Sequence, residues 1–272
     1  MTWPAWTASA ALVVLAAAVP AAGAAPQQER AQAYYQFLLG RYLDGEGEVD
    51  RAVEAFREAA RLDPGSGEIC AELASLYARE DQAEKAVEWG EAALRLDATN
   101  HEAHRILGLI AASEAGLHER GRLADPARLA AAVHAVEHLE SARRPDRLVD
   151  PSIDLTLSRL YLRTGRGEKA VPVLLRLVAF DPERPGLSLM LADAYEQSGR
   201  LELAAESLQR AVDQQPRDPD LLDRLGDILF RLGRNAGALN AWERALAAGG
   251  PRVDREGLER KIRAAREKEP QR

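Results

Sequence analysis

Apolar residues recur along most of this chain at spacings of three or four positions, in paired segments joined by short polar turns. Residues 191–216, LADAYEQSGRLELAAESLQRAVDQQP, show the pattern most clearly. Two helices are predicted here, with a turn at Ser198-Gly199 and an end at Pro216, which lacks the N–H that a helix needs. Their apolar faces consist of Leu191, Ala192 and Tyr195, then Ala204, Leu208 and Ala211.

The same paired pattern repeats with a period of 34 residues, because Ala170 and Ala238 stand 34 positions before and after Ala204. A single pair of this size cannot bury both of its apolar faces, so it needs neighbours of the same kind. We count six such units over about residues 33–250. The repeats therefore predict one elongated array of stacked helix pairs.

This pattern resembles the tetratricopeptide repeat family, whose repeat has the same length. The resemblance implies an all-α fold, a right-handed α-solenoid of stacked antiparallel helix pairs. The chain departs from the family pattern at Gln36 and Asp154, where Trp is favoured, at Gly90, where a large residue is favoured, and at Ala98, in place of a closing Pro.

Residues 252–272 follow the last unit and form a charged segment with one narrow apolar stripe, Leu258, Ile262 and Ala265. We expect a C-terminal capping helix and tail that cover the last exposed face of the array 33–251.

The third unit is irregular. Its two helix signatures are separated by about 15 additional residues, which gives an insertion at about 112–129. Asp125 as N-cap and Pro126 at the first helical position predict the start of a lengthened second helix. Insertions in such arrays form loops that serve for binding or are merely tolerated, and the sequence leaves both alternatives open.

The first 25 residues carry no charged side chain, and a small-residue segment, Ala22-Gly23-Ala24, follows an apolar run. This is typical of a secretory signal peptide, followed by a short linker at 26–32, so the mature protein is expected to be periplasmic or secreted. The alternative is an uncleaved membrane anchor that faces the periplasm, although the run is short and broken by Pro20.

The formal net charge is −7, from 36 basic and 43 acidic residues, which argues against nonspecific nucleic-acid binding. The single cysteine, Cys70, occupies an apolar repeat position and is interpreted as a small buried hydrophobe. Three aromatic residues, Tyr34, Tyr35 and Phe37, are expected to shield the open N-terminal end of the array, with a ligand-contacting cluster as the alternative.

All five histidines lie in the third unit, and His134 and His138 are four residues apart, a spacing that can hold a metal. No H-E-x-x-H pattern or further ligand accompanies them, so we predict no metal site. The other three histidines are His101, His104 and His118.

No nucleophile, phosphate-binding or dinucleotide-binding motif appears, and we predict a non-enzymatic protein without catalytic residues or cofactors. The leading hypothesis is an exported scaffold that binds a protein or peptide partner in a bacterial envelope assembly. The alternatives are a regulatory subunit that docks on a membrane enzyme or transporter, and a repeat-based enzyme or metal-binding protein that uses the His-rich third unit.

The family resemblance also implies which residues face the concave groove. The groove is then basic in its middle and acidic toward the C-terminus, so a partner of split charge is expected there. The family's carboxylate clamp is absent, because Phe37, Arg41, Ala71 and Ser75 occupy its positions. The predicted groove residues are Arg105, Arg159, Arg163, Asp193, Glu196, Asp220, Asp223 and Asp227.

Overall fold

The computed structural model describes residues 24–117, 123–144, 149–250 and 253–268, and these residues form helices and turns without strands. They divide into two compact units, residues 1–65 and 66–272. The first unit contains α1 (Ala24–Gly45) and α2 (Val49–Leu62). The second contains α3 (Gly67–Arg79), α4 (Ala83–Leu96), α5 (His101–Glu114), α6 (Pro126–Ala142), α7 (Pro151–Arg163), α8 (Gly167–Phe180), α9 (Leu187–Gln197), α10 (Leu201–Gln214), α11 (Pro219–Arg231), α12 (Asn235–Ala248) and α13 (Arg255–Lys268).

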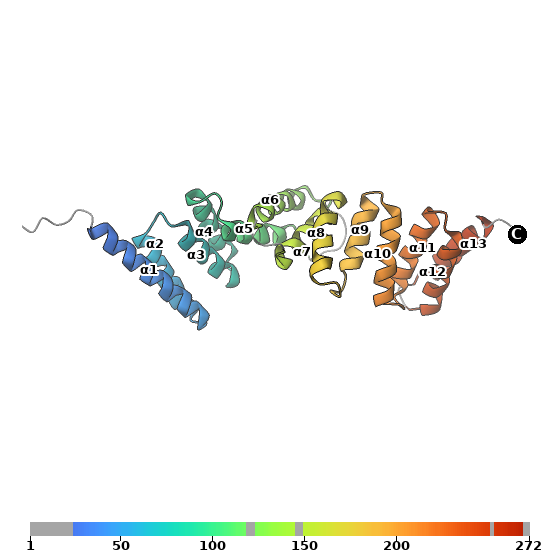
Figure 1. Ribbon diagram of the computed structural model, residues 1–272, viewed down its shortest axis with the longest axis horizontal. Coiled ribbons are helices and arrows are strands. Elements are labelled where there is room, and N and C mark those ends of the chain that lie inside the picture. Colours follow the sequence, from blue (N-terminus) through green and yellow to red (C-terminus); the bar gives the residue numbers. More distant parts are fainter. Residues whose placement is uncertain (1–23, 118–122, 145–148, 251–252, 269–272) are drawn as a thin grey trace, which may run out of the picture. The chain divides into compact units, whose positions relative to one another are not determined.

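Consecutive helices pack in pairs, α1 with α2 in the first unit and α3 with α4 through α11 with α12 in the second. In the second unit each pair also contacts the next one, so that α3 to α13 follow one another in chain order (Figure 1). The predicted all-α class and the stacked helix pairs are confirmed.

The turns inside the pairs have the backbone geometry that their sequences predict. Gly165, Gly199 and Gly233 have φ values of 74°, 72° and 73°, which a residue without Cβ adopts at little cost. Asp81 takes the corresponding place with φ of 57°, and among the described residues it is the one non-glycine with positive φ. An acidic side chain therefore replaces glycine in the α3–α4 turn.

Three helices begin with an aspartate N-cap followed by proline, at Asp125-Pro126, Asp150-Pro151 and Asp218-Pro219. In each, the carboxylate accepts a hydrogen bond from a free backbone N–H of the first turn, and proline supplies the helical φ. The predicted start of α6 at Pro126 is confirmed.

Small residues bring the helices of a pair into close contact. Ala170, Ala204 and Ala238, the residues at the repeat period, are fully buried. Gly108 and Gly226 lie against Leu139 and Trp242 of the partner helix. The core of the second unit continues from Ala112 to Ala265, so the apolar stripe of α13 is buried as predicted.

The insertion lies between α5 and α6, within residues 115–125, of which 118–122 lie outside the described residues. Its ends are fastened to the array, because Ala115 is fully buried and the Leu123 N–H donates to the Arg163 carbonyl at 3.1 Å. Residues 112–114, expected to belong to the insertion, instead complete α5.

The N-terminal aromatic residues differ from the expectation. Phe37 is buried against Phe56, with ring centroids 5.8 Å apart. Tyr34 and Tyr35 are 64% and 63% exposed, so the shielding role predicted for them is wrong. Tyr35 lies on the opposite side of the helix from Phe37, whereas Tyr34, three residues before Phe37, lies at the edge of the face that holds it.

Cys70 is buried beside Ala71, Ala93 and Ala103, and burial raises the pKa of its thiol, which confirms its interpretation as a packing residue. Residues 26–32, expected as a linker, belong to α1. Residues 1–23 of the predicted signal peptide lie outside the described residues. Within the described part of the chain, no helix combines the length and apolarity that a membrane span requires.

Candidate partner-binding surface

The predicted groove residues all lie on the first helices of their pairs. They are Arg105 on α5, Arg159 and Arg163 on α7, Asp193 and Glu196 on α9, and Asp220, Asp223 and Asp227 on α11. These helices are neighbours, since α3 contacts α5, α5 contacts α7, and α7 contacts α9. The first helices therefore form a continuous face in the second unit.

The acidic residues of α9 are bound by basic residues of α11. Arg224 Nη2 donates to Asp193 Oδ1 at 2.5 Å and to Glu196 Oε2 at 3.3 Å. Arg231 Nη1 donates to Glu196 Oε1 at 2.7 Å. Burial raises the pKa of Asp193, and the charge of Arg224 offsets only part of this effect. These carboxylates thus join two helix pairs.

Lys261 of α13 makes the equivalent contacts one pair further on. Its ammonium donates to Asp223 Oδ1 at 2.6 Å and to Asp227 Oδ2 at 2.9 Å. Burial would lower the pKa of Lys261, but the hydrogen bonds to both aspartates outweigh it and raise the pKa. The acidic end of the predicted groove is largely neutralised by the chain itself, and Asp220 remains exposed.

The two basic residues of α7 have different environments. Arg163 Nη1 donates to the carbonyl of Gly116, and its own carbonyl accepts from Leu123. Arg163 therefore fastens the insertion to α7. Arg159 is exposed and presents its guanidinium to solvent.

A cavity of about 370 Å³ lies where α5 meets the end of α6 and the start of α7. Its lining combines basic, acidic and small residues, namely His101, Glu102, Arg105, Ala142, Arg143, Arg144, Asp150, Ser152 and Ile153. Arg105 was predicted as a groove residue, whereas Arg143 and Arg144 were not. These two arginines follow α6 directly, at a position that the family pattern does not assign to the groove.

Arg105 is oriented by Glu102 on its own helix. Arg105 Nε and Nη2 donate to the two Glu102 carboxylate oxygens at 2.8 and 2.5 Å. Burial would raise the pKa of Glu102, but the hydrogen bonds and the charge of Arg105 hold the pKa below its ordinary value. Ser75 of α3 also hydrogen-bonds Glu102. The carboxylate is therefore ionised and holds the guanidinium in place.

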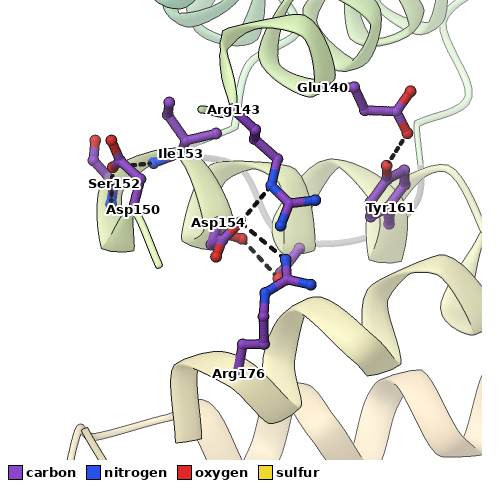
Figure 2. Close-up of polar contacts among 9 residues, drawn as sticks. Glu140, Arg143, Asp150, Ser152, Ile153, Asp154, Tyr161 and Arg176 are labelled. Atoms are coloured by element: carbon purple, nitrogen blue, oxygen red, sulfur yellow. Dashed lines mark hydrogen bonds and ion pairs between the residues drawn. The ribbon is translucent and has the colours of Figure 1, made fainter. Parts of the chain in front are cut away.

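Arg143 is held by a buried acid. Asp154 is 1% exposed, and its Oδ1 lies 3.3 Å from both Arg143 Nε and Arg176 Nη2. Figure 2 shows the carboxylate between the two guanidinium groups, which come from the end of α6 and from α8. The sequence marked Asp154 only as a departure from an aromatic residue. A charge at a core position, with two arginines on the adjoining helices, was the signal that could have located this site.

Tyr161 lies beside this site on α7 and donates its hydroxyl hydrogen to Glu140 of α6. Burial raises the pKa of the phenol, and the hydrogen bond to Glu140 raises it further. Figure 2 shows this contact beyond the Asp154 cluster, so two polar contacts join α6 to α7.

The structure brings two of the histidines together. His104 Nδ1 of α5 lies 2.9 Å from His138 Nδ1 of α6, and His104 Nε2 lies 3.1 Å from the Ala98 carbonyl. Because that carbonyl accepts only, the neutral His104 carries its proton on Nε2, and His138 donates from Nδ1. His134 points to Glu137 at 3.7 Å. His101 Nδ1 lies 2.9 Å from the Ser141 carbonyl, and His118 lies outside the described residues.

A metal ion needs a larger group of ligating side chains than the His104–His138 pair. Across the described ranges, no three His, Cys, Asp or Glu side chains form a group that could hold a metal ion. The histidine pair forms a polar contact between α5 and α6.

Two family models described as tetratricopeptide repeat match the sequence. One matches residues 14–67, 155–219, 189–254 and 224–268, and the other matches residues 45–110. Comparison of the sequence with curated proteins gives no match.

Solved structures share the fold at low sequence identity. YrrB, described as a TPR protein with an unusual peptide-binding site, superposes with a TM-score of 0.59 at 16% identity, over 78% of this chain and 99% of YrrB. MamA superposes with a TM-score of 0.52 at 19% identity, over 68% of this chain and 93% of MamA. A MamA structure from AMB-1 gives 0.53 at 18% identity, over 71% of this chain and 96% of its own.

Proposed function

The chain belongs to the tetratricopeptide repeat family, and from this premise we propose that it is an exported, non-enzymatic scaffold that binds a protein or peptide partner. The proposed binding surface is the face formed by the first helices α5, α7, α9 and α11. The family fold serves protein interaction, and YrrB, which shares it, has a peptide-binding site.

The observation that carries this proposal is the continuity of that face. Side chains of one first helix bond to the next, as Ser75 of α3 does with Glu102 of α5 and Asp193 of α9 does with Arg224 of α11. Such links hold several helix pairs in a fixed relative arrangement. An extended segment of a partner can then contact many repeats at once, without ordering them first.

The exposed charged residues on this face indicate where the partner binds. Arg159 is the exposed basic residue of α7, and Asp220 is the exposed acidic residue of α11. A partner segment with acidic residues toward α7 and basic residues toward α11 would complement both. Contacts between exposed charges accelerate association and weaken as salt is added.

Export and an envelope location are parts of the same proposal. They are supported by the uncharged, apolar residues 1–25 and by the small residues that end this segment. Binding in the envelope requires no catalytic group, and this agrees with the absence of a recognisable catalytic motif in the sequence.

The experiment is crosslinking and pull-down of the tagged chain from its host, with identification of the captured protein and measurement of its affinity for the purified chain. We expect Arg159→Glu to weaken binding by at least about threefold and to reduce its salt dependence. Arg217→Glu, an equal charge reversal at an exposed residue between α10 and α11, is the matched control. Equal affinities for wild type and the Arg159 variant, with the helical fold intact, would place the binding surface elsewhere.

A further inference from the structure

We propose that the cavity between α5, the end of α6 and the start of α7 is a carboxylate-binding site for an acidic residue of the partner. The inference rests on the proposed function, because it supposes that a peptide segment lies along the first helices. It adds the chemical class of the group that is recognised and the residues that recognise it.

Three arginines line this one cavity, Arg105, Arg143 and Arg144. They come from different parts of the fold, Arg105 from α5 and the other two from the residues that follow α6. Guanidinium groups bind carboxylates through paired N–H donors, which gives both charge and geometry. Ser152, at the start of α7, adds a hydroxyl to the wall.

Two of these arginines are held by a carboxylate through only part of their N–H donors, so each keeps further donors. Glu102 occupies Nε and Nη2 of Arg105, so Nη1 takes no part in that pair. Asp154 contacts Arg143 through Nε, and within the described part of the chain the terminal nitrogens of Arg143 have no partner. Figure 2 shows Arg143 extending from the end of α6, with its Nε directed at Asp154. Preorientation of this kind lowers the entropy lost on binding.

The charges of the cavity wall favour a monoanion. Its two carboxylates, Glu102 and Asp150, face three arginines. Glu102 is bound by Arg105, and Asp150 caps α7 by accepting from the N–H groups of Ser152 and Ile153, each at 3.2 Å. The start of α7 contributes a further partial positive charge. With the pair behind the wall included, Asp154 and Arg176, four arginines face three carboxylates, so one positive charge remains in excess and matches one carboxylate.

The size of the cavity fits an acidic side chain or a chain-terminal residue. A volume of about 370 Å³ accommodates one residue of a peptide and some water, but not a folded element. Its position beside the face of α5 and α7 lets a segment bound there insert one residue. The carboxylate has two possible sources in the partner, an Asp or Glu side chain or the C-terminus.

The test titrates the purified full chain with small probes and follows the arginine Nε–H signals by NMR, which detects millimolar binding. N-acetylglutamate amide carries a side-chain carboxylate, N-acetylalanine carries a terminal one, and N-acetylglutamine amide is the neutral control. We expect saturable shifts of the Arg143 and Arg144 signals with at least one acid, and none with the neutral probe. The acid that binds more tightly identifies the source of the carboxylate.

Arg144→Gln is the informative variant, because Arg144 is exposed and makes no contact that the described fold needs. We expect it to weaken binding of the acid probe by about fivefold or more. Arg217→Gln, outside the cavity, is the matched control and should bind as the wild type does. No shift with either acid up to about 20 mM, an equal response to the neutral probe, or unchanged binding by Arg144→Gln would overturn the proposal.

The captured partner separates this inference from the proposed function. If the partner binds wild type and Arg144→Gln equally, the cavity is not its carboxylate site, and the scaffold proposal stands. If no partner is captured, the scaffold proposal fails, while the probe titration still decides whether the cavity binds carboxylates.

Discussion

Asp154 shows how a single residue changes the chemistry of a helix interface. It occupies a core position in α7, where the family favours a large aromatic residue, and it is 1% exposed. Burial of a carboxylate is costly unless it is paired, and here Arg143 and Arg176 both contact Oδ1. Among the described residues Oδ2 has no hydrogen-bond partner, so the cluster is only partly satisfied. Helices α6, α7 and α8 are thereby joined through one acid.

Removal of this acid is expected to destabilise the array. Asp154→Ala leaves two guanidinium groups without their common partner, a loss of the kind that costs several kcal/mol when the group is buried. Both arginine side chains are about one third exposed, so water recovers part of this cost, and we expect a loss of about 2–3 kcal/mol. Urea denaturation followed by circular dichroism measures it.

Asp213→Ala removes an exposed aspartate of α10 and serves as the control for Asp154→Ala. It should change the unfolding free energy by less than about 0.5 kcal/mol. An equally small change for Asp154→Ala would show that the buried ion pairs contribute nothing to stability.

His138 makes stability depend on pH. Burial lowers its pKa, and His104 and His134 lower it further, against the opposing charges of Glu137 and Glu91. The unfolded chain therefore binds a proton more readily than the folded chain does, so stability falls as pH drops below the ordinary histidine pKa. We expect the melting temperature of the wild type to fall more between pH 7.5 and 5.5 than that of His138→Gln.

His101→Gln is the control for the His138 variant. His101 is another histidine of the helix pair α5–α6, and it contacts a backbone carbonyl instead of a second histidine. It should keep most of the wild-type pH dependence. If the melting temperatures of both variants and of the wild type depend on pH in the same way, protonation of His138 does not destabilise the fold.

At the scale of the elements, helix pairs depend on residues without side chains at the contact points. A Cβ at Gly226 of α11 would lie 2.4 Å from Trp242 Nε1, and one at Gly108 of α5 would lie 2.7 Å from Leu139 Cγ. Trp242 is among the largest fully buried side chains, so its ring has little room to move. The close approach of α11 and α12 thus requires glycine.

Glycine-to-alanine substitutions at these contacts should change the stability of the fold by different amounts. Alanine gains about 1 kcal/mol within a helix, but overpacking costs about 1–3 kcal/mol. We expect Gly226→Ala to be clearly destabilising, because the clash exceeds the gain. Gly90→Ala meets Leu107 at 3.1 Å and should be close to neutral, because a leucine side chain can shift slightly. Urea midpoints in the reverse order would contradict the packing argument.

Helix α13 covers the last pair through Leu258, Ile262 and Ala265, and Lys261 binds the aspartates of α11. Truncation after Gly250 should therefore expose apolar surface on α12 and remove the two half-buried contacts of Lys261 with Asp223 and Asp227. We expect the melting temperature to fall by about 5 °C or more and aggregation to increase. Truncation after Lys268 keeps α13 and is the control. Equal melting of both truncated chains would remove the capping role of α13.

At the scale of the whole molecule, ion pairs link first helices in series. Arg224 and Arg231 of α11 bind the acids of α9, and Lys261 of α13 binds the acids of α11. Each such pair crosses the boundary between neighbouring helix pairs. The charged face proposed for partner binding is therefore also a structural component of the array.

Export is the prediction that concerns the whole chain. An uncharged apolar segment that ends in small residues should be removed during secretion, so the protein isolated from its host should begin near Ala25 or Pro26. Intact-mass analysis of soluble and membrane fractions measures this. A mass that includes Met1, recovered with membranes, would favour the anchor instead.

The sequence by itself determined the helices and their order. Apolar spacing and the 34-residue period predict the pairs and their stacking, because both depend on residues close in the chain or one period apart. The aspartate-proline start of α6 and the apolar stripe of α13 were predicted for the same reason. Contacts one period apart could also have been anticipated, as for Asp227 and Lys261, which are 34 residues apart.

Only the tertiary structure decided which charged side chains are paired within the chain and which remain exposed to a partner. Asp193 and Asp227 share a groove position in the family pattern, because they are 34 residues apart, but Arg224 and Lys261 on the next first helix neutralise them. The Arg143–Asp154–Arg176 cluster joins three unlike helices at separations that no repeat period describes. Charge pairing depends on side-chain placement to within about an ångström, and this is fixed by how the helices pack rather than by how they are spaced along the chain.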